Sequence, residues 1–458
     1  MNSDNSTVTS RRQFLQGAGG AAAASALAGI ALPPAHAQGS DLIQVALVGC
    51  GGRGTGAAIN ALSTKSGPIK LVAMADAYAD RLQSSFDGLS KAVPKLMEVP
   101  ADRRFVGFDA YRKALDCLKQ GDVAIFTTPP AFRWVHFQYA IEKRLNVFME
   151  KSVTVDGPTS RRMLRLADES VARGLKCGVG LMSRHSRSLQ ELHERVRGGE
   201  IGEILLMRGY RMHGPAGQTG PRPPTMSELE FQVRRFHAFL WAGAGFYTDW
   251  CIHIIDHLCW MKNAWPVKAQ ALGGRHYRTA PDGTPLVDQN FDTYSVEYTF
   301  ADGTKMFMNG RCMNGAAGIY SSYLHGTRGS AIASRANDCG GPSATFRGQG
   351  MNPANQTWQS KDTTNPYQNE WDALIDAIRN DKPHNEVRRG VEASLTANMG
   401  RMAAHTGQEI TWQDMLNCEH EMAPGLDRLT SQSPAPLQPG PDGRYPVPMP
   451  GITTKREY

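Results

Sequence analysis

The stretch LIQVALVGCGGRG, residues 42–54, decides the fold class of this chain. Its first half is almost entirely apolar, which is typical of a strand buried on both faces of a parallel sheet. The motif G-x-G-x-x-G follows at once, and the helix-compatible segment 55–62 comes next. A glycine-rich turn between a buried strand and a helix predicts a dinucleotide-binding unit, with the diphosphate at the helix N-terminus.

The residues of the glycine loop have separate physical roles. Gly49 permits the tight turn after the strand, and Gly51 lets the backbone approach a diphosphate. Gly54 allows the helix to pack closely on the strand. Gly52 and Arg53 lie in the same loop. We therefore expect all five residues to contact a bound dinucleotide.

An acidic residue follows the second apolar segment. Residues 69–75 read as another buried strand, which ends at Asp76, 22 residues after Gly54. A carboxylate here can accept hydrogen bonds from both hydroxyls of a ribose and should repel a 2′-phosphate. The sequence therefore predicts NAD as the cofactor. Arg81 lies one helical turn further on, which keeps NADP open as the alternative.

The alternation of apolar strands with helical segments continues to residue 185 and predicts a Rossmann domain, a doubly wound parallel sheet, over residues 41–185. Its other elements are expected as strands at 123–128, 146–149 and 176–182 and as helices at 111–118, 132–143 and 159–173. Ligands bind beyond the carboxyl ends of parallel strands. The residues at these ends, which we expect to face the cofactor, are Thr127, Pro129, Glu150 and Lys151.

The periodicity changes after residue 185. Strands are expected at 202–211, 267–272, 293–300, 305–311 and 321–324, and helices at 189–196, 365–379 and 387–406. We predict a second α/β domain over residues 186–410, with a large open, mainly antiparallel sheet. Residues 411–458 are rich in Pro and Gly, and we expect them to form a tail that is extended over the surface or partly disordered.

The first 37 residues have the features of a twin-arginine signal peptide. Arg11 and Arg12 precede Gln-Phe-Leu, the run 17–32 is mostly Ala and Gly, and Ala35-His36-Ala37 fits the small-x-small cleavage rule. The run is too weakly apolar for a membrane anchor, which needs ~20 strongly apolar residues. We expect a periplasmic or otherwise exported protein, with no stable membrane insertion after cleavage.

Composition argues against several other classes of protein. The net charge is +7, but the 50 basic residues are scattered among 43 acidic ones, so nucleic-acid binding is not expected. The 8 cysteines include no C-x-x-C pair, which argues against a disulfide scaffold, a thioredoxin-type site or a zinc ribbon.

A polar stripe interrupts an apolar helical segment near residue 250. Asp249, His253, Asp256 and His257 are spaced i, i+4, i+7 and i+8 and therefore share one helix face. Buried charged groups must be paired or functional. The stripe is consistent with a structural polar network, a metal site, or a general acid/base at His253. The dinucleotide site in the preceding domain favours the third alternative.

Taken in order, the glycine motif, the strand that ends in Glu-Lys and the Asp-x-x-x-His-x-x-Asp helix resemble the Gfo/Idh/MocA family of glucose–fructose oxidoreductase and inositol dehydrogenase. The resemblance covers roughly residues 43–405. It implies an N-terminal domain that binds NAD(P) and a C-terminal sheet that holds a sugar or polyol and often forms oligomer contacts. The family's Glu-Lys-Pro maps onto residues 150–152, where Ser152 replaces proline.

This resemblance places catalysis on three residues. His253 would take the proton of a sugar hydroxyl, Asp249 would orient the imidazole ring if it contacts it, and Lys151 would stabilise the developing charge on oxygen. No catalytic metal is expected. Weaker candidates to contact the substrate are Arg235, His237, Tyr247 and Asp256.

Two enzyme classes remain open. One is an oxidoreductase of sugars or polyols. The other is a glycoside hydrolase or lyase that uses NAD transiently, by oxidation, elimination and re-reduction. A sugar-binding protein with a degenerate Rossmann fold is a third interpretation, which intact Lys151, Asp249 and His253 disfavour. Because an exported protein meets little free NAD, we expect a tightly held dinucleotide.

Overall fold

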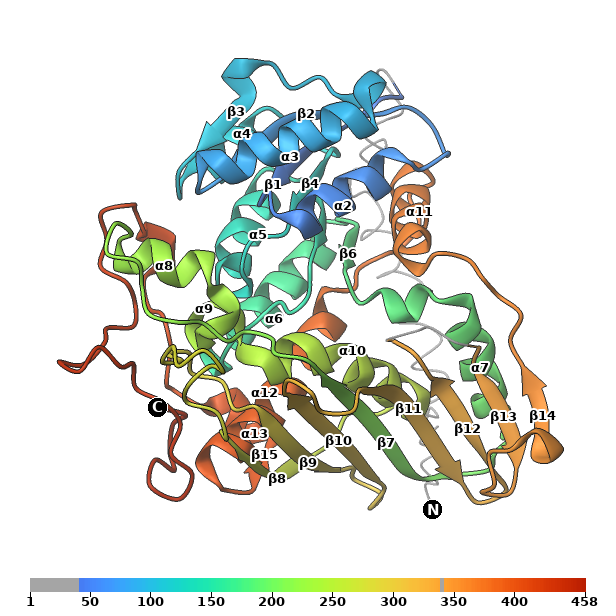
Figure 1. Cartoon of the computed structure of the whole chain (residues 1–458). Coiled ribbons are helices and arrows are strands. Elements are labelled where there is room, and N and C mark those ends of the chain that lie inside the picture. Colours follow the sequence, from blue (N-terminus) through green and yellow to red (C-terminus); the bar gives the residue numbers. More distant parts are fainter. Residues whose placement is uncertain (1–40, 338–341) are drawn as a thin grey trace, which may run out of the picture. The chain divides into compact units, whose positions relative to one another are not determined.

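The computed structural model describes residues 41–337 and 342–458, so the predicted signal peptide at 1–37 lies outside the described residues. Residues 42–458 contain two sheets (Figure 1). The first is parallel with strand order β3-β2-β1-β4-β5-β6, the order expected of a Rossmann domain. Its strands are β1 (Ile43–Val48), β2 (Ile69–Asp76), β3 (Arg104–Val106), β4 (Val123–Phe126), β5 (Asn146–Met149) and β6 (Cys177–Val179).

Helices connect these parallel strands, as the predicted alternation requires. They are α2 (Gly52–Leu62), α3 (Ala79–Ala92), α4 (Ala110–Asp116), α5 (Arg133–Glu142) and α6 (Gly157–Ala172). The first of them begins inside the glycine motif, three residues earlier than expected, with Gly51 at its N-cap. The turn between β1 and α2 is therefore shorter than the sequence suggested, and the backbone N–H groups of the loop lie at the helix N-terminus.

The second sheet has nine strands in the order β14-β13-β12-β11-β7-β10-β9-β8-β15. Neighbours are antiparallel except β7 and β10, which confirms the expected open, mainly antiparallel sheet. Its strands are β7 (Ile204–His213), β8 (Lys268–Gly274), β9 (Thr293–Thr299), β10 (Lys305–Cys312), β11 (Ile319–Gly326), β12 (Gly329–Ser334), β13 (Ala344–Arg347), β14 (Gln356–Gln359) and β15 (Ile410–Thr411).

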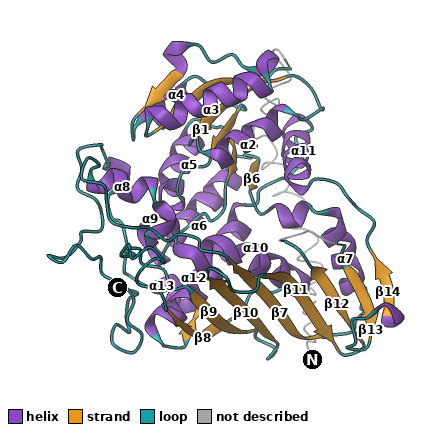
Figure 2. Ribbon diagram, in the orientation of Figure 1, coloured by secondary structure: helices purple, strands orange, loops and turns teal. Residues whose placement is uncertain are grey.

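Two long helices, α10 (Gly245–Lys262) and α12 (Val387–Thr406), pack on one face of the second sheet (Figure 2). Shorter helices complete this half of the chain: α7 (Arg187–Arg197), α8 (Glu228–Arg234) and α9 (Leu240–Gly243). Helix α10 lies very close to the strands, because a Cβ on Gly209 would come within 2.5 Å of Ile254. Within the described residues, no helix is long and apolar enough to cross a membrane.

One helix departs from the expected division at residue 185. Helix α11 (Pro366–Arg379) follows the second sheet in sequence but packs against the first domain, beside α2 (Figure 1). The Trp371 ring centroid lies 4.4 Å from that of Phe148 on β5, and the Gln368 side chain hydrogen-bonds Asn60 on α2. The first domain is therefore built from two separate parts of the sequence.

The segment expected as a surface tail is held into the fold. It contains α13 (Trp412–Asn417), and its Tyr445 is buried and packs edge-on against Phe239 at 5.0 Å between ring centroids. Glu457 is only 2% exposed and pairs with Arg401. Prolines and glycines here make turns between anchoring side chains, so the segment runs over the surface with several side chains packed into the fold.

Candidate functional site

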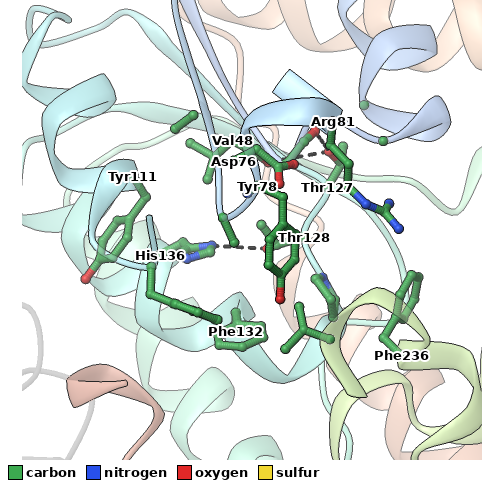
Figure 3. A pocket seen from close by; sticks show the side chains of 18 of the residues that line it. Val48, Asp76, Tyr78, Arg81, Tyr111, Thr127, Thr128, Phe132, His136 and Phe236 are labelled. Atoms are coloured by element: carbon green, nitrogen blue, oxygen red, sulfur yellow. Dashed lines mark hydrogen bonds between the residues drawn. The ribbon is translucent and has the colours of Figure 1, made fainter. Parts of the chain in front are cut away.

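A cavity of about 300 Å³ lies at the carboxyl ends of β1, β2 and β4 (Figure 3). The structure brings most of the predicted cofactor residues together there. Those that line the cavity are Gly49, Gly51, Gly52, Arg53, Gly54, Asp76, Thr127 and Pro129, whereas the predicted Glu150 and Lys151 do not line it. Arg81 and Thr128 complete this wall. The rule that ligands bind beyond parallel strand ends therefore located the cavity correctly.

Two positions of the glycine loop have no room for a side chain or require a backbone conformation that favours glycine. Gly49 has a φ of +97°, and a Cβ on Gly54 would lie 2.1 Å from the carbonyl oxygen of Gly49. By contrast, a Cβ on Gly52 would meet nothing within 4 Å. The loop therefore has a tightly packed inner side and an open outer side, as a cradle for a diphosphate requires.

Asp76 binds the glycine loop as well as facing the cavity. One carboxylate oxygen accepts from the backbone N–H of Cys50 at 2.6 Å, and the other accepts from that of Tyr78 at 2.9 Å. Burial raises the pKa of Asp76 above its ordinary value, against these hydrogen bonds, which lower it. The carboxylate is thus fixed in place. The preference of this site for NAD over NADP stays a prediction.

The opposite wall of the cavity is aromatic and was not predicted. Tyr111, Phe132 and His136 lie on one side (Figure 3). The His136 ring is buried, and burial followed by the nearby Arg133 lowers its pKa to about 3, so the ring is neutral. A flat, apolar surface of this kind suits a nucleobase. The one feature of the sequence that could have indicated these residues is their position shortly after the ends of strands.

A segment of the second half closes the cavity. Val233, Phe236 and His237 line it, although they lie far beyond the first domain in sequence. We call residues 228–237 the strap. Arg234 fastens the strap with two hydrogen bonds to Asp80 on α3, at 2.8 and 2.9 Å, and its guanidinium carbon lies 4.0 Å from the centroid of the Tyr78 ring.

Lys151, Asp249 and His237 form a connected cluster at the end of the cavity. The Lys151 ammonium donates to the Asp249 carboxylate at 2.9 Å and to its backbone carbonyl at 2.6 Å. His237 Nδ1 lies 3.1 Å from the other Asp249 oxygen. Burial alone would raise the pKa of Asp249, but Lys151 and His237 more than offset it, and the pKa lies below its ordinary value. Asp249 is therefore ionised at neutral pH.

His253 lies near this cluster but is not oriented by Asp249. The two carboxylate oxygens of Asp249 go to Lys151 and His237, and the buried Nδ1 of His253 has no hydrogen-bond partner among the described residues. Helical spacing puts both residues on one face, yet the carboxylate turns toward Lys151. Burial first, and then Lys151, lowers the pKa of His253 well below its ordinary value, so the imidazole is neutral.

The rest of the polar stripe is structural. Asp256 is fully buried and is held by the Arg184 guanidinium at 2.7–3.1 Å, while His257 Nε2 lies 2.8 Å from Ser322 Oγ. Because the side chains bind different partners, they do not converge on a metal ion. In the part of the chain that the structure describes, no three metal-ligating side chains gather at one point.

Three of the four weaker substrate candidates lie elsewhere. Asp256 and Tyr247 are both 0% exposed, and the Tyr247 hydroxyl lies 3.1 Å from that of Tyr298, so we assign both to packing. Arg235 is exposed and does not line the dinucleotide-type cavity, so its contact with a substrate stays a prediction. His237 alone is in place, where it lines the cavity and contacts Asp249.

Glu150 acts on the cavity indirectly. It is 6% exposed, lies behind the cavity wall and forms an ion pair with Arg53, whose guanidinium carbon also lies 4.7 Å from the Tyr367 ring centroid. Glu150 therefore does not line the cavity itself but contacts Arg53, which does, and its direct contact with a cofactor stays a prediction. The peptide bond between Lys151 and Ser152, where the family has proline, is cis.

Fold and site together define a two-domain α/β protein with a dinucleotide-type cavity beside a Lys–Asp–His cluster. Residues 189–332 match the model of the GFO/IDH/MocA C-terminal domain. The chain is 26% identical over 167 residues to inositol 2-dehydrogenase 1 of Paenarthrobacter aurescens, a match that covers 36% of this chain and 44% of the relative. The chain thus spans less than half the length of that relative.

Solved structures share the fold over most of the chain. Aldose–aldose oxidoreductase from Caulobacter crescentus, complexed with glycerol, superposes with a TM-score of 0.60 at 14% identity, over 81% of this chain and 99% of that one. Scyllo-inositol dehydrogenase from Lactobacillus casei, with bound NAD(H) and scyllo-inositol, gives 0.58 at 18%, over 81% and 99%. Residues 189–332 are therefore similar to the C-terminal domain of the GFO/IDH/MocA family.

Proposed function

We propose that this chain is an exported NAD(P)-dependent oxidoreductase that acts on a sugar or polyol and holds its dinucleotide tightly. One observation carries the proposal. The cavity that begins at the glycine loop includes His237, which contacts Asp249, and Asp249 binds Lys151. His237 therefore belongs both to the dinucleotide-type cavity and to a cluster whose side chains can take part in proton transfer.

The residues that line the cavity are of the types that bind a dinucleotide. The open side of the glycine loop and the N-terminus of α2 would hold the diphosphate, and Asp76 would bind a ribose. The aromatic wall around Tyr111 would take the nucleobase. When bound, NAD(P) supplies the acceptor for a hydride. The NAD(H) complex of the Lactobacillus casei structure supports this assignment.

The chain's own side chains supply the proton transfer. Oxidation of a carbinol requires loss of a proton from oxygen, and the neutral His253 imidazole is able to accept it. Lys151 can donate a hydrogen bond to the same oxygen and stabilise negative charge there. Asp249 holds Lys151 through two hydrogen bonds, so its role is to position the ammonium group.

Three further parts of the proposal have separate support. The signal-like features of residues 11–37 favour export by the twin-arginine route. The strap, fastened by Arg234, favours slow exchange of the dinucleotide. Exposed apolar side chains on the second sheet, among them Leu205 and Leu272, favour a homo-oligomer formed through that sheet.

The test is to purify the natively exported protein, identify any retained dinucleotide by mass spectrometry, and then assay a panel of sugars, polyols and glycosides. We expect bound NAD and net oxidation of a sugar or polyol, with the cofactor left reduced when no acceptor is added. Glycoside cleavage with the cofactor returned to its starting redox state would instead establish the transient-oxidation mechanism. A protein that binds no dinucleotide would refute both.

A further inference from the structure

Arg211 lies close to the candidate catalytic histidine and has no counter-ion among the described residues. The residue is half-buried on β7, and its Nε is fully buried. Across residues 41–337 and 342–458 its guanidinium makes no ion pair or hydrogen bond. The guanidinium lies over the Tyr320 ring, with 3.7 Å between the guanidinium carbon and the ring centroid. Partly buried charges normally have a partner, so this arrangement needs an explanation.

The strand register shows that Arg211 faces α10. Two residues earlier, Gly209 lies against Ile254, and two residues later, the His213 ring lies 5.5 Å from that of Phe246. Alternate residues of a strand share a face, so Arg211 lies opposite the part of α10 between these two contacts. That part contains His253, and the positive charge of Arg211 contributes to lowering the pKa of His253.

Other polar groups near Arg211 also lack partners. Tyr320 is paired with Arg211 in the sheet register, and its buried hydroxyl has no hydrogen-bond partner among the described residues. His213 donates from Nδ1 to the carbonyl of Gly214 at 2.7 Å, which leaves Nε2 as an acceptor without a partner in the described part of the chain. Buried polar atoms without partners are costly unless a ligand or water satisfies them. These atoms are therefore available to a polar ligand.

The charge balance indicates what kind of ligand fits. Asp249, one helical turn before His253 on α10, is already paired with Lys151 and His237. Arg211 is therefore a surplus positive charge on the side of the sheet that faces His253. A guanidinium fork binds a planar carboxylate through two parallel hydrogen bonds, and the Tyr320 hydroxyl can donate a further one.

We propose that the substrate is an acidic sugar, and that Arg211 selects it by binding the sugar carboxylate while His253 faces the carbon to be oxidised. The inference rests on the proposed function, because it assigns the substrate of that same site. His213 Nε2 would accept a hydrogen bond from a neighbouring sugar hydroxyl. A neutral sugar would leave the Arg211 charge uncompensated and would bind more weakly.

The test compares matched pairs of ligands on the dinucleotide-loaded protein. Isothermal titration measures the affinity for glucuronate against glucose and for galacturonate against galactose, and oxidation of each is assayed separately. We expect the acidic member of at least one pair to bind at least about tenfold more tightly, as loss of a charge-assisted hydrogen bond implies. R211M should abolish this difference. R211K should keep only part of it, because lysine retains the charge but not the fork.

The matched control is R311M. Arg311 lies on β10, next to β7, but its side chain is on the opposite face, because Gly310 and not Arg311 lies against α10. R311M should therefore keep the full preference for the acidic sugar. Circular dichroism verifies that each variant folds. If R211M does not fold, the inference is judged on R211K, which should keep only part of the preference for the acidic sugar.

Two outcomes separate this inference from the proposed function. If neutral sugars are oxidised and bind as tightly as the acidic ones, or if the preference survives in R211M, the inference is wrong and the proposed function stands. If acidic sugars bind through Arg211 but no sugar is ever oxidised, the proposed function is wrong and the binding site stands. Failure of every acidic sugar to bind would overturn the inference.

Discussion

Replacing Glu457 by glutamine should destabilise the protein by about 3 kcal/mol at neutral pH. The Glu457 carboxylate accepts from Arg401 at 2.7 and 2.9 Å and lies 2.6 Å from His405 Nδ1, in a fully buried cluster. Arg401 in turn donates to the backbone carbonyls of Ala244, just before α10, and Val155, four residues after Lys151. The cluster therefore supports both elements that carry the candidate catalytic residues.

The size of the effect follows from the pKa of Glu457. Burial alone would raise it, but Arg401 and His405 outweigh burial and lower it from 4.5 to about 2. A shift of this size is equivalent to about 3 kcal/mol. Because the pKa is lower in the folded state than in the unfolded state, the stabilisation is complete above about pH 5 and is lost as the pH falls toward 2.

Thermal unfolding followed by circular dichroism measures the effect. For a chain spanning residues 42–458, the unfolding entropy is roughly 0.9 kcal/mol/K, so E457Q should lower Tm by about 3–4 °C at pH 7. At pH 3 less than about half of this Tm difference between E457Q and wild type should remain. At that pH the Glu457 carboxylate of the wild-type protein takes up a proton on unfolding, which removes part of its stabilising effect.

A surface ion pair provides the control. Glu419 pairs with Arg161 at 3.3 Å, but its side chain is 88% exposed, and E419Q should change Tm by less than about 1 °C. The reasoning is refuted if E457Q unfolds at the same temperature as E419Q, or if its Tm difference from wild type is as large at pH 3 as at pH 7.

Three further predictions concern the site. Lys151→Ala and His253→Ala should each lower turnover by about 10²–10⁴-fold while dinucleotide affinity, measured by fluorescence titration, stays within about twofold of wild type; near-normal turnover in either would reassign that residue. The wild-type protein should bind NAD more tightly than NADP, and Asp76→Asn should narrow the gap, because the repulsion of a 2′-phosphate is removed; equal wild-type affinities would show this wrong. Arg234→Met should release bound dinucleotide several-fold faster in a dialysis or stopped-flow assay, because the strap loses its ion pair with Asp80; an unchanged release rate would mean that the strap does not limit exchange.

The fold was largely predictable because its signals are local. Apolar strands alternate with helical segments up to residue 185, and the glycine motif after β1 has one well-defined structural use. The docking of α11 on the first domain was not predictable in this way. Its amphipathic pattern predicts a helix with one buried face, but periodicity does not say which of two sheets that face will cover.

Sequence reasoning named residues of the candidate site but not their side-chain contacts. Helical spacing correctly put Asp249 and His253 on one face, yet the rotamer of Asp249 is decided by Lys151 and His237, which come from other parts of the chain. Asp256 looked equally functional in sequence, and only the position of Arg184 shows that it is structural. Side-chain partners of this kind depend on tertiary packing, which a single sequence does not display.

The return of α11 to the first sheet affects how the chain folds and how it can be recombined. Trp371 covers Phe148, but α11 begins almost 190 residues after β6 ends. Contacts across such a separation are slow to form, so the first sheet has to wait for a distant helix before its core is sealed. In a chimera of two related proteins joined at residue 185, the first sheet would come from one protein and the α11 that packs on it from the other. Exchange of the first domain between related proteins should therefore carry residues 366–379 along with residues 41–185.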